Sequence, residues 1–101
     1  MAFRLLYHPL VASDDLPQLA ASARERVRLA VERCLTTHPE HFGKPLRSTL
    51  RGLWSLRVGI YRVIYRIQGP EVLILKIGHR QKVYGQALSR VRRAGPPGAR
   101  A

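Results

Sequence analysis

Residues 53–67 read LWSLRVGIYRVIYRI, two runs of strand-forming residues separated by Gly59-Ile60. A two-residue connection that begins with glycine is typical of a tight β-hairpin, so we expect two antiparallel strands here. The loop length fixes the register and places Arg57 directly opposite Arg62. Because side chains alternate along a strand, one face of the hairpin is aromatic and apolar, and the other face carries the arginines. The first face is therefore predicted to cover a core.

A third strand is predicted from Val72 to about Arg80, after a turn at Gly69-Pro70. A three-residue loop, or an equivalent bulge, places Lys76 on the arginine-bearing face instead of among the aromatic side chains. Burying an unpaired lysine is costly, so we expect this register. In that register the apolar residues that join the aromatic face are Leu73, Leu75 and Ile77.

The segments on either side of these strands predict one α+β domain over residues 1–93. The apolar and polar patterns predict four further elements: a strand over residues 3–8, a short helix over 9–16, a helix over 22–37 and a helix over 82–93. The helix over 22–37 begins with a capping box, Ser22-x-x-Glu25. We expect a small antiparallel sheet, made of the N-terminal strand and a three-stranded meander, packed against two N-terminal helices, with a short C-terminal helix. Residues 94–101 are rich in glycine and proline and are predicted to be a disordered tail.

The charge of the chain is concentrated in its second half. The 101 residues contain 18 Lys and Arg against 6 Asp and Glu, a net charge of +12. Residues 1–42 are neutral, whereas residues 43–101 contain one acid, Glu71, so we expect a polyanionic partner. The alternative is that the charge serves solubility and forms a basic tail. The single cysteine, Cys34, excludes an internal disulfide, and the lack of a long apolar run or signal peptide favours a cytoplasmic protein without a membrane anchor.

The arginine-bearing face is the candidate site for chemistry. Arg57 opposite Arg62 is a repulsive pair, and Arg66, Lys76 and Arg80 are predicted on the same face. An external phosphate, held bidentately by arginine, resolves this repulsion, and the cations also stabilise a phosphoryl-transfer transition state. The alternative is an ordinary solvated sheet face.

Tyr84, near the end of the last predicted strand, is a second candidate. Its hydroxyl is suited to take the proton from a ribose 2′-hydroxyl, and its ring is suited to stack on a base. A packing tyrosine is the alternative reading. Metal-dependent schemes lack ligands, because His38-x-x-His41 has too few partners and the basic half contains only Glu71. We therefore expect no metal and no cofactor.

Several motifs together resemble the RelE/ParE superfamily of bacterial and archaeal toxins, over about residues 3–92. They are Gly43-Lys-Pro-Leu-Arg47, Leu50-x-Gly52, the hairpin Trp54–Tyr65, and Gly78-His-Arg-x-x-Val-Tyr84. The last motif resembles the RelE branch more than the ParE branch. The resemblance implies the toxin of a type II toxin–antitoxin system: a ribosome-dependent mRNA endoribonuclease that needs no metal, because the 2′-hydroxyl attacks its neighbouring phosphate. The alternatives are a ParE-like inhibitor of DNA gyrase and a non-catalytic member of the same fold.

The resemblance also implies roles for individual residues. Arg62 and Arg80 match phosphate-binding arginines, Tyr84 a catalytic or stacking tyrosine, and Arg57 a basic residue on the same face. Where members of the family carry lysines this chain has Leu53 and Ser55, so His79 and Lys82 are the nearest substitutes for a general base. The implied partners are the ribosome, mRNA and an acidic antitoxin encoded by the adjacent gene, which forms a hetero-oligomer with the toxin. The expected RNA contacts are Lys44, Arg47, Arg51, Arg66, Lys76, Lys82, Arg90, Arg92 and Arg93.

Overall fold

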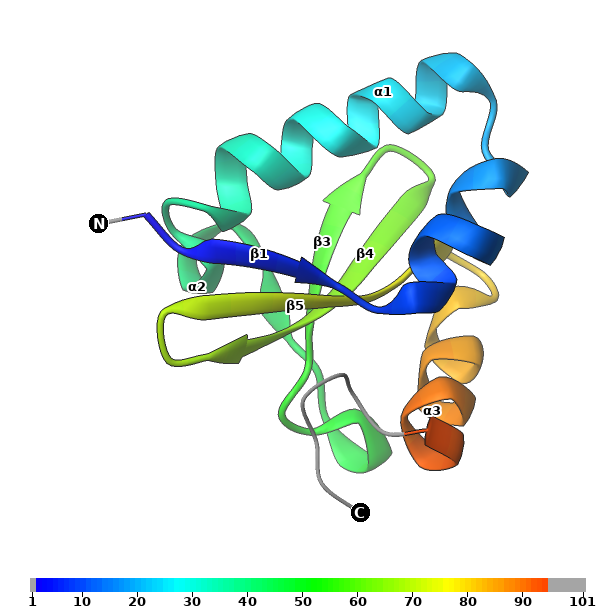
Figure 1. Ribbon diagram of the computed structural model, residues 1–101. Helices are drawn as coiled ribbons and strands as arrows, with labels where there is room; N and C mark the ends of the chain where they lie inside the picture. Colours follow the sequence, from blue (N-terminus) through cyan, green and yellow to red (C-terminus); the bar gives the residue numbers. More distant parts are fainter. Residues whose placement is uncertain (1, 95–101) are drawn as a thin grey trace.

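A mixed β-sheet forms the centre of the computed structural model, which describes residues 2–94 (Figure 1). Within those residues the sheet has five strands in the order β1-β5-β4-β3-β2. Their bounds are β1 Arg4–Tyr7, β2 Lys44–Pro45, β3 Trp54–Val58, β4 Tyr61–Gln68 and β5 Glu71–His79. The expected α+β class is confirmed. Of the tail predicted over residues 94–101, Ala94 instead ends the last helix, and residues 95–101 lie outside the described residues.

Two features of the sheet differ from the sequence prediction. The N-terminal strand β1 runs parallel to β5, so the sheet is mixed rather than wholly antiparallel. The sequence pattern gives no direction for a strand that pairs with residues more than sixty positions away. The short strand β2 was also missed, because two residues with a proline among them carry no alternating pattern.

Helical segments lie between the strands in chain order and after the last strand. They are η1 Val11–Asp15, η2 Leu16–Gln18, α1 Ala21–Ala30, η3 Val31–Leu35, α2 Pro39–Phe42, η4 Ser48–Leu50 and α3 Val83–Ala94. The helix predicted over 22–37 corresponds to α1 and η3, and its first hydrogen bond runs from the Arg24 N–H to the Ala20 carbonyl. The predicted capping box is wrong, because Ala20 is the N-cap and Ser22 already lies inside the helix.

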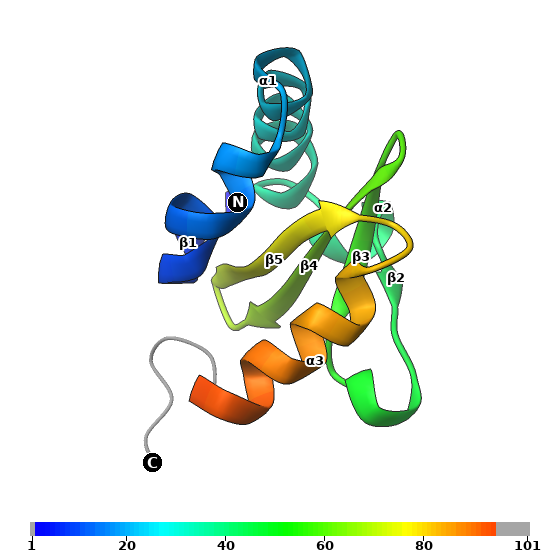
Figure 2. The same ribbon diagram turned by 90° about the vertical axis from the view of Figure 1, so that its right-hand side faces the viewer.

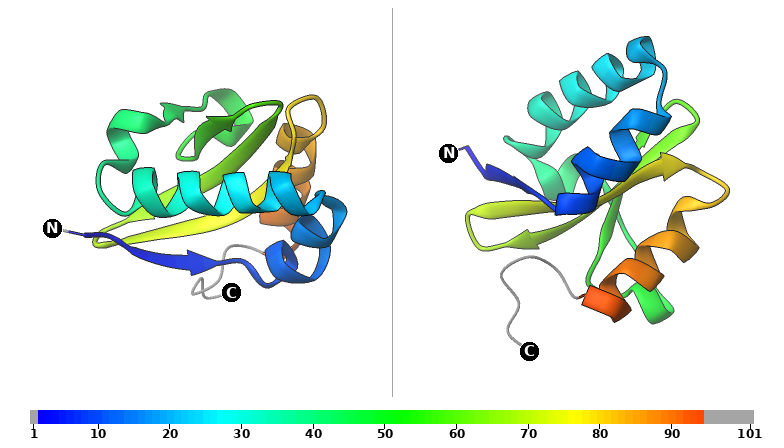
Figure 3. Two further views of the ribbon diagram at one scale, coloured as in Figure 1. Left: turned by 90° about the horizontal axis from the view of Figure 1, so that it is seen from above. Right: turned by 45° about the vertical axis from the view of Figure 1, so that its right-hand side comes forward.

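The sheet is covered on both faces. Figure 2 shows the strands between α1 on one side and α3 on the other, and Figure 3 shows α1 lying across the strands. Val27, Val31 and Leu35 pack with Tyr65 on the aromatic face. A second cluster lies between α3 and the other face; its buried members are Leu53, Ile64, Leu73, Leu75, Val83 and Ala87.

The hairpin register agrees with the sequence prediction. Arg57 lies opposite Arg62. Gly59 has a φ of 61°, the left-handed conformation that the first position of this loop requires.

The next hairpin has a two-residue loop, and the predicted bulge lies in mid-strand between Ile64 and Tyr65. Lys76 is therefore on the arginine-bearing face, as expected. Leu73 and Leu75 are on that face too, contrary to the prediction, because only residues beyond the bulge are shifted. The α3 helix covers them.

Candidate nucleic-acid interface

Two arginines meet at the end of the sheet near the β3–β4 turn. Arg57 is exposed, and Arg62 is half-buried directly opposite it. The Arg62 Nη1 donates hydrogen bonds to the carbonyl oxygens of Gly59, at 3.0 Å, and Tyr61, at 2.9 Å. These bonds fix the guanidinium over the turn. Among the ion pairs of residues 2–94, none involves either arginine, so their charges remain available to an external anion.

Arg80 is brought to the same end of the sheet by a backbone contact. It follows β5 directly, and its N–H donates to the carbonyl of Ile60, in the β3–β4 turn, at 2.9 Å. The Arg80 side chain is exposed. The three arginines predicted to bind phosphate therefore come from three strand ends that the fold gathers around one turn.

The hydroxyl of Tyr84 lies on the arginine-bearing face. Tyr84 is in the first turn of α3, and its hydroxyl is 3.3 Å from the Oγ of Ser55 in β3. Ser55 is two residues before Arg57, so their side chains share a face of the sheet. The sequence did not predict this contact, because it joins residues 29 positions apart on different elements.

His79 is oriented differently from the other predicted catalytic residues. It lies opposite Tyr61 in the β4–β5 ladder. The two rings are arranged edge to face, with their centroids 6.5 Å apart. The pairing places His79 on the side of the sheet opposite to Arg62, since neighbouring residues alternate. Its Nδ1 accepts a hydrogen bond from the Gln81 N–H at 3.1 Å. The fold therefore does not bring His79 together with Tyr84.

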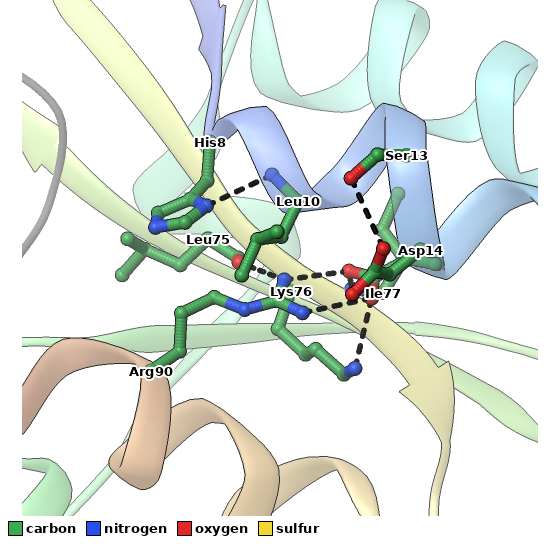
Figure 4. Close-up of polar contacts among 9 residues, drawn as sticks. His8, Leu10, Ser13, Asp14, Leu75, Lys76, Ile77 and Arg90 are labelled. Atoms are coloured by element: carbon green, nitrogen blue, oxygen red, sulfur yellow. Dashed lines mark hydrogen bonds and ion pairs between the residues drawn. The ribbon is translucent and has the colours of Figure 1, made fainter. Parts of the chain in front are cut away.

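Two of the residues expected to contact RNA, Lys76 and Arg90, are instead buried around Asp15. The Lys76 Nζ lies 2.8 Å from Asp15 Oδ1, and the Arg90 Nη1 lies 2.8 Å from Asp15 Oδ2. The Asp15 side chain is 0% exposed, and the cationic side chains are 9% and 8% exposed. Figure 4 shows Arg90 reaching from α3 to the strand that carries Lys76 and Ile77. The expectation for these two residues is wrong, because an acid from the neutral half of the chain neutralises them.

The other predicted RNA contacts lie in four places within the described residues. Lys44 is exposed in the edge strand β2, and Arg47 and Arg51 are exposed on either side of η4. Arg66 is half-buried in β4, four residues from Arg62, which is about 13 Å along a strand. Lys82 is exposed just before α3. The side chains of Arg92 and Arg93 lie outside the described part of the structure.

Other candidate features contribute nothing to this interface. Within residues 2–94, no group of three or more His, Cys, Asp and Glu side chains is placed to hold a metal ion. Cys34 lies on the packed side of the helix, where burial raises the pKa of its thiol. In the same residues, no helix has the length and apolar character needed to cross a membrane.

Comparison with known proteins identifies the family. A family described as the ParE toxin of type II toxin–antitoxin system, parDE, matches residues 3–84. Over 52 residues, half of this chain, the sequence is 44% identical to toxin RelG and 44% identical to toxin RelE of Mycobacterium tuberculosis (strain ATCC 25618 / H37Rv). The matched segments span 60% of RelG and 54% of RelE, so they cover little more than half of each relative.

A solved structure agrees with this assignment over a longer stretch. The toxin–antitoxin complex RelBE2 of Mycobacterium tuberculosis matches with a TM-score of 0.73 and 32% identity, covering 79% of this chain and 93% of that one. The chain belongs to the ParE toxin family, within the RelE/ParE superfamily of type II toxin–antitoxin toxins.

A buried histidine beside the Asp15 cluster predicts that stability depends on pH. Burial, and then the charge of Arg90, lower the pKa of His8, whereas Asp15 raises it. The unfolded chain takes up this proton near pH 6.5, before the folded chain does, so the free energy of unfolding should fall as the pH decreases through 6.5. Urea unfolding at pH 7.5 and 5.5 measures this dependence.

The variant His8→Asn retains an acceptor for the Leu10 N–H, which donates to His8 Nδ1 at 3.1 Å, and removes the titrating group. It should flatten the pH dependence. His41→Gln, at an exposed position in α2, is the control and should leave the dependence unchanged. Equal pH dependence in wild type and His8→Asn would contradict the prediction.

Proposed function

We propose that this chain is an mRNA endoribonuclease of the RelE type. The observation that carries the proposal is the convergence of Arg57, Arg62 and Arg80 at one end of the sheet, with the Tyr84 hydroxyl on the face that carries Arg57 and Arg62. A scissile phosphate is the ligand that best satisfies such a group of unpaired guanidinium ions. The 44% identity to proteins named RelG and RelE also supports this choice.

The proposed reaction is an internal transfer that needs no metal. The ribose 2′-oxygen attacks the adjacent phosphorus, its proton passes to a base, and the 5′-oxygen leaves and takes up a proton. The products are a 2′,3′-cyclic phosphate and a 5′-hydroxyl end. The arginines stabilise the negative charge that accumulates on the phosphoryl oxygens in the transition state.

We assign the proton-accepting role to Tyr84. Leu53 and Ser55, which stand where lysines are expected, are both buried, and neither is a base. Ser55 instead contacts the Tyr84 hydroxyl at 3.3 Å and holds it on the arginine-bearing face. His79 is on the other side of the sheet, and Lys82 is exposed to solvent just before α3.

The partners follow from the same proposal. Exposed Lys44, Arg47 and Arg51 form a basic edge suited to ribosomal RNA phosphates. The RelBE2 structure is a toxin–antitoxin complex, and this chain should likewise form a hetero-oligomer with an acidic antitoxin. We place the complex in the cytoplasm, where translation supplies the mRNA.

Primer extension on a defined mRNA in a reconstituted translation system tests the function. In the presence of ribosomes, the wild-type chain is expected to produce new 5′ ends inside translated codons. Intact mRNA would reject the proposal. The ParE description of the family favours gyrase as the second candidate, and inhibition of DNA supercoiling by the chain would support it.

A further inference from the structure

A cavity lies at the edge of β5, beyond the end of β1. β1 pairs with β5 only as far as Ile74, and the strand continues to His79. The η1–η2 segment and the start of α3 form the other walls of this half-open space of about 460 Å³. We call this space the glutamine cavity, because its lining includes Gln18, Gln81 and Gln86.

The lining of the glutamine cavity matches the chemistry of a nucleobase. Its three glutamines come from η2, from the turn after β5 and from α3. Each amide presents a donor beside an acceptor, the pattern with which glutamine recognises a base edge. Tyr61 also lines the cavity and offers an aromatic ring, the group on which proteins stack unpaired bases.

The charge of the lining favours an anionic ligand. Asp15 is the only acid that lines the cavity, and four hydrogen bonds occupy its oxygens. The donors are Lys76, the Ile77 N–H and two nitrogens of Arg90. Lys82 adds an exposed cation at the rim. A nucleotide fits this combination better than a neutral or cationic ligand does.

The glutamine cavity adjoins the arginine cluster through two strands. Tyr61 precedes Arg62 in β4, and His79, which also lines the cavity, precedes Arg80. Gly78, which also lines the cavity, lies directly opposite Arg62 in the β4–β5 ladder and therefore on the same side of the sheet. The Cα atoms of residues paired in this way are about 4.5–5.5 Å apart, so a nucleotide that adjoins a phosphate held by Arg62 lies close to the cavity.

We propose that the glutamine cavity receives the base of the RNA nucleotide adjoining the cleaved phosphate, and that Gln18 and Gln86 determine which base is accepted. This inference rests on the proposed endoribonuclease function, and it explains how the enzyme would prefer one base over another beside the cut. A well-placed amide pair discriminates between bases by about tenfold.

Mapping of all 5′ ends produced on a mixed set of mRNAs tests the inference. Gln18→Ala and Gln86→Ala should still cut RNA, but their preference between bases at the position beside the cut should fall about tenfold. Gln68→Ala is the matched control, because Gln68 ends β4 at the far hairpin, opposite Glu71. It should keep the wild-type profile. Unchanged profiles in both cavity variants would overturn the inference and leave the endoribonuclease function standing.

A binding measurement makes the inference independent of cleavage. The four nucleoside 5′-monophosphates and ribose 5-phosphate are titrated into the Arg62→Ala chain, and the glutamine side-chain amides are followed by NMR. Base-dependent shifts that Gln86→Ala abolishes would support the cavity even if the wild-type chain cuts no RNA, in which case only the proposed function fails. Equal responses to ribose 5-phosphate and to all four nucleotides would overturn the inference.

Discussion

Replacing Asp15 with alanine is expected to lower the free energy of unfolding by about 3–5 kcal/mol, the usual effect of removing one partner from a buried ion pair. Lys76 and Arg90 would remain buried without their carboxylate, and the Ile77 N–H would lose its acceptor. The same carboxylate joins η1, β5 and α3, so α3 should loosen along with the sheet edge. Urea or guanidinium denaturation followed by circular dichroism measures the loss.

Asp14→Ala is the matched control for this prediction. Asp14 is the neighbouring acid and is exposed, with a hydrogen bond only to Ser13 Oγ among the described contacts. Its removal should change the free energy of unfolding by less than about 0.5 kcal/mol. Asp15→Asn separates charge from shape, because it keeps one acceptor oxygen and removes the negative charge. A similar stability for the two alanine variants would show that the buried cations do not depend on Asp15.

The Asp15 cluster also marks the limit of what the sequence could predict. Hairpin register depends on a two-residue loop and on alternation, so the position of Arg57 opposite Arg62 could be derived from residues close together in the chain. Asp15 and Lys76 are 61 positions apart, and no local pattern relates them. Counting charges by halves of the chain hid this pair, since the acid lies in the neutral half.

The register of β5 shows a similar limit. The cost of burying an unpaired lysine correctly indicated a bulge or an odd loop and placed Lys76 on the arginine-bearing face. It did not indicate where along the strand the bulge lies, and that position determines the faces of Leu73 and Leu75. On the arginine-bearing face, Leu73 and Leu75 are buried by α3, whose apolar residues Val83 and Ala87 belong to the same core cluster.

The residues of the predicted site differ in how far their positions depend on local sequence. Arg57 and Arg62 are paired across the local β3–β4 hairpin, and Arg80 follows β5, the strand that pairs with β4. Tyr84 joins them because α3 packs over Ser55, a contact that depends on the whole fold. The glutamine cavity combines η2, the end of β5 and α3, so its lining could not be read from any single motif.

Arg62→Ala is expected to lower the rate of mRNA cleavage about 10²–10³-fold, the usual effect of removing one donor that stabilises a transition-state anion. The side chain contacts only backbone carbonyls of its own turn among the described hydrogen bonds, so the fold should remain intact. Single-turnover cleavage on ribosomes paused at one codon measures the rate, and denaturation checks the fold. Arg26→Ala, an exposed arginine of α1 on the other side of the sheet, is the control and should cleave normally.

Tyr84→Phe then separates the two roles that Tyr84 can have in that reaction. Phenylalanine keeps the ring that stacks on a base and loses the hydroxyl beside Ser55. If the hydroxyl accepts the 2′-proton, the rate should fall by about 10²–10⁴-fold, the contribution typical of a general base. A wild-type rate in Tyr84→Phe would assign the tyrosine to stacking and move the base elsewhere, whereas wild-type rates in both Tyr84→Phe and Arg62→Ala would remove this face of the sheet from the reaction.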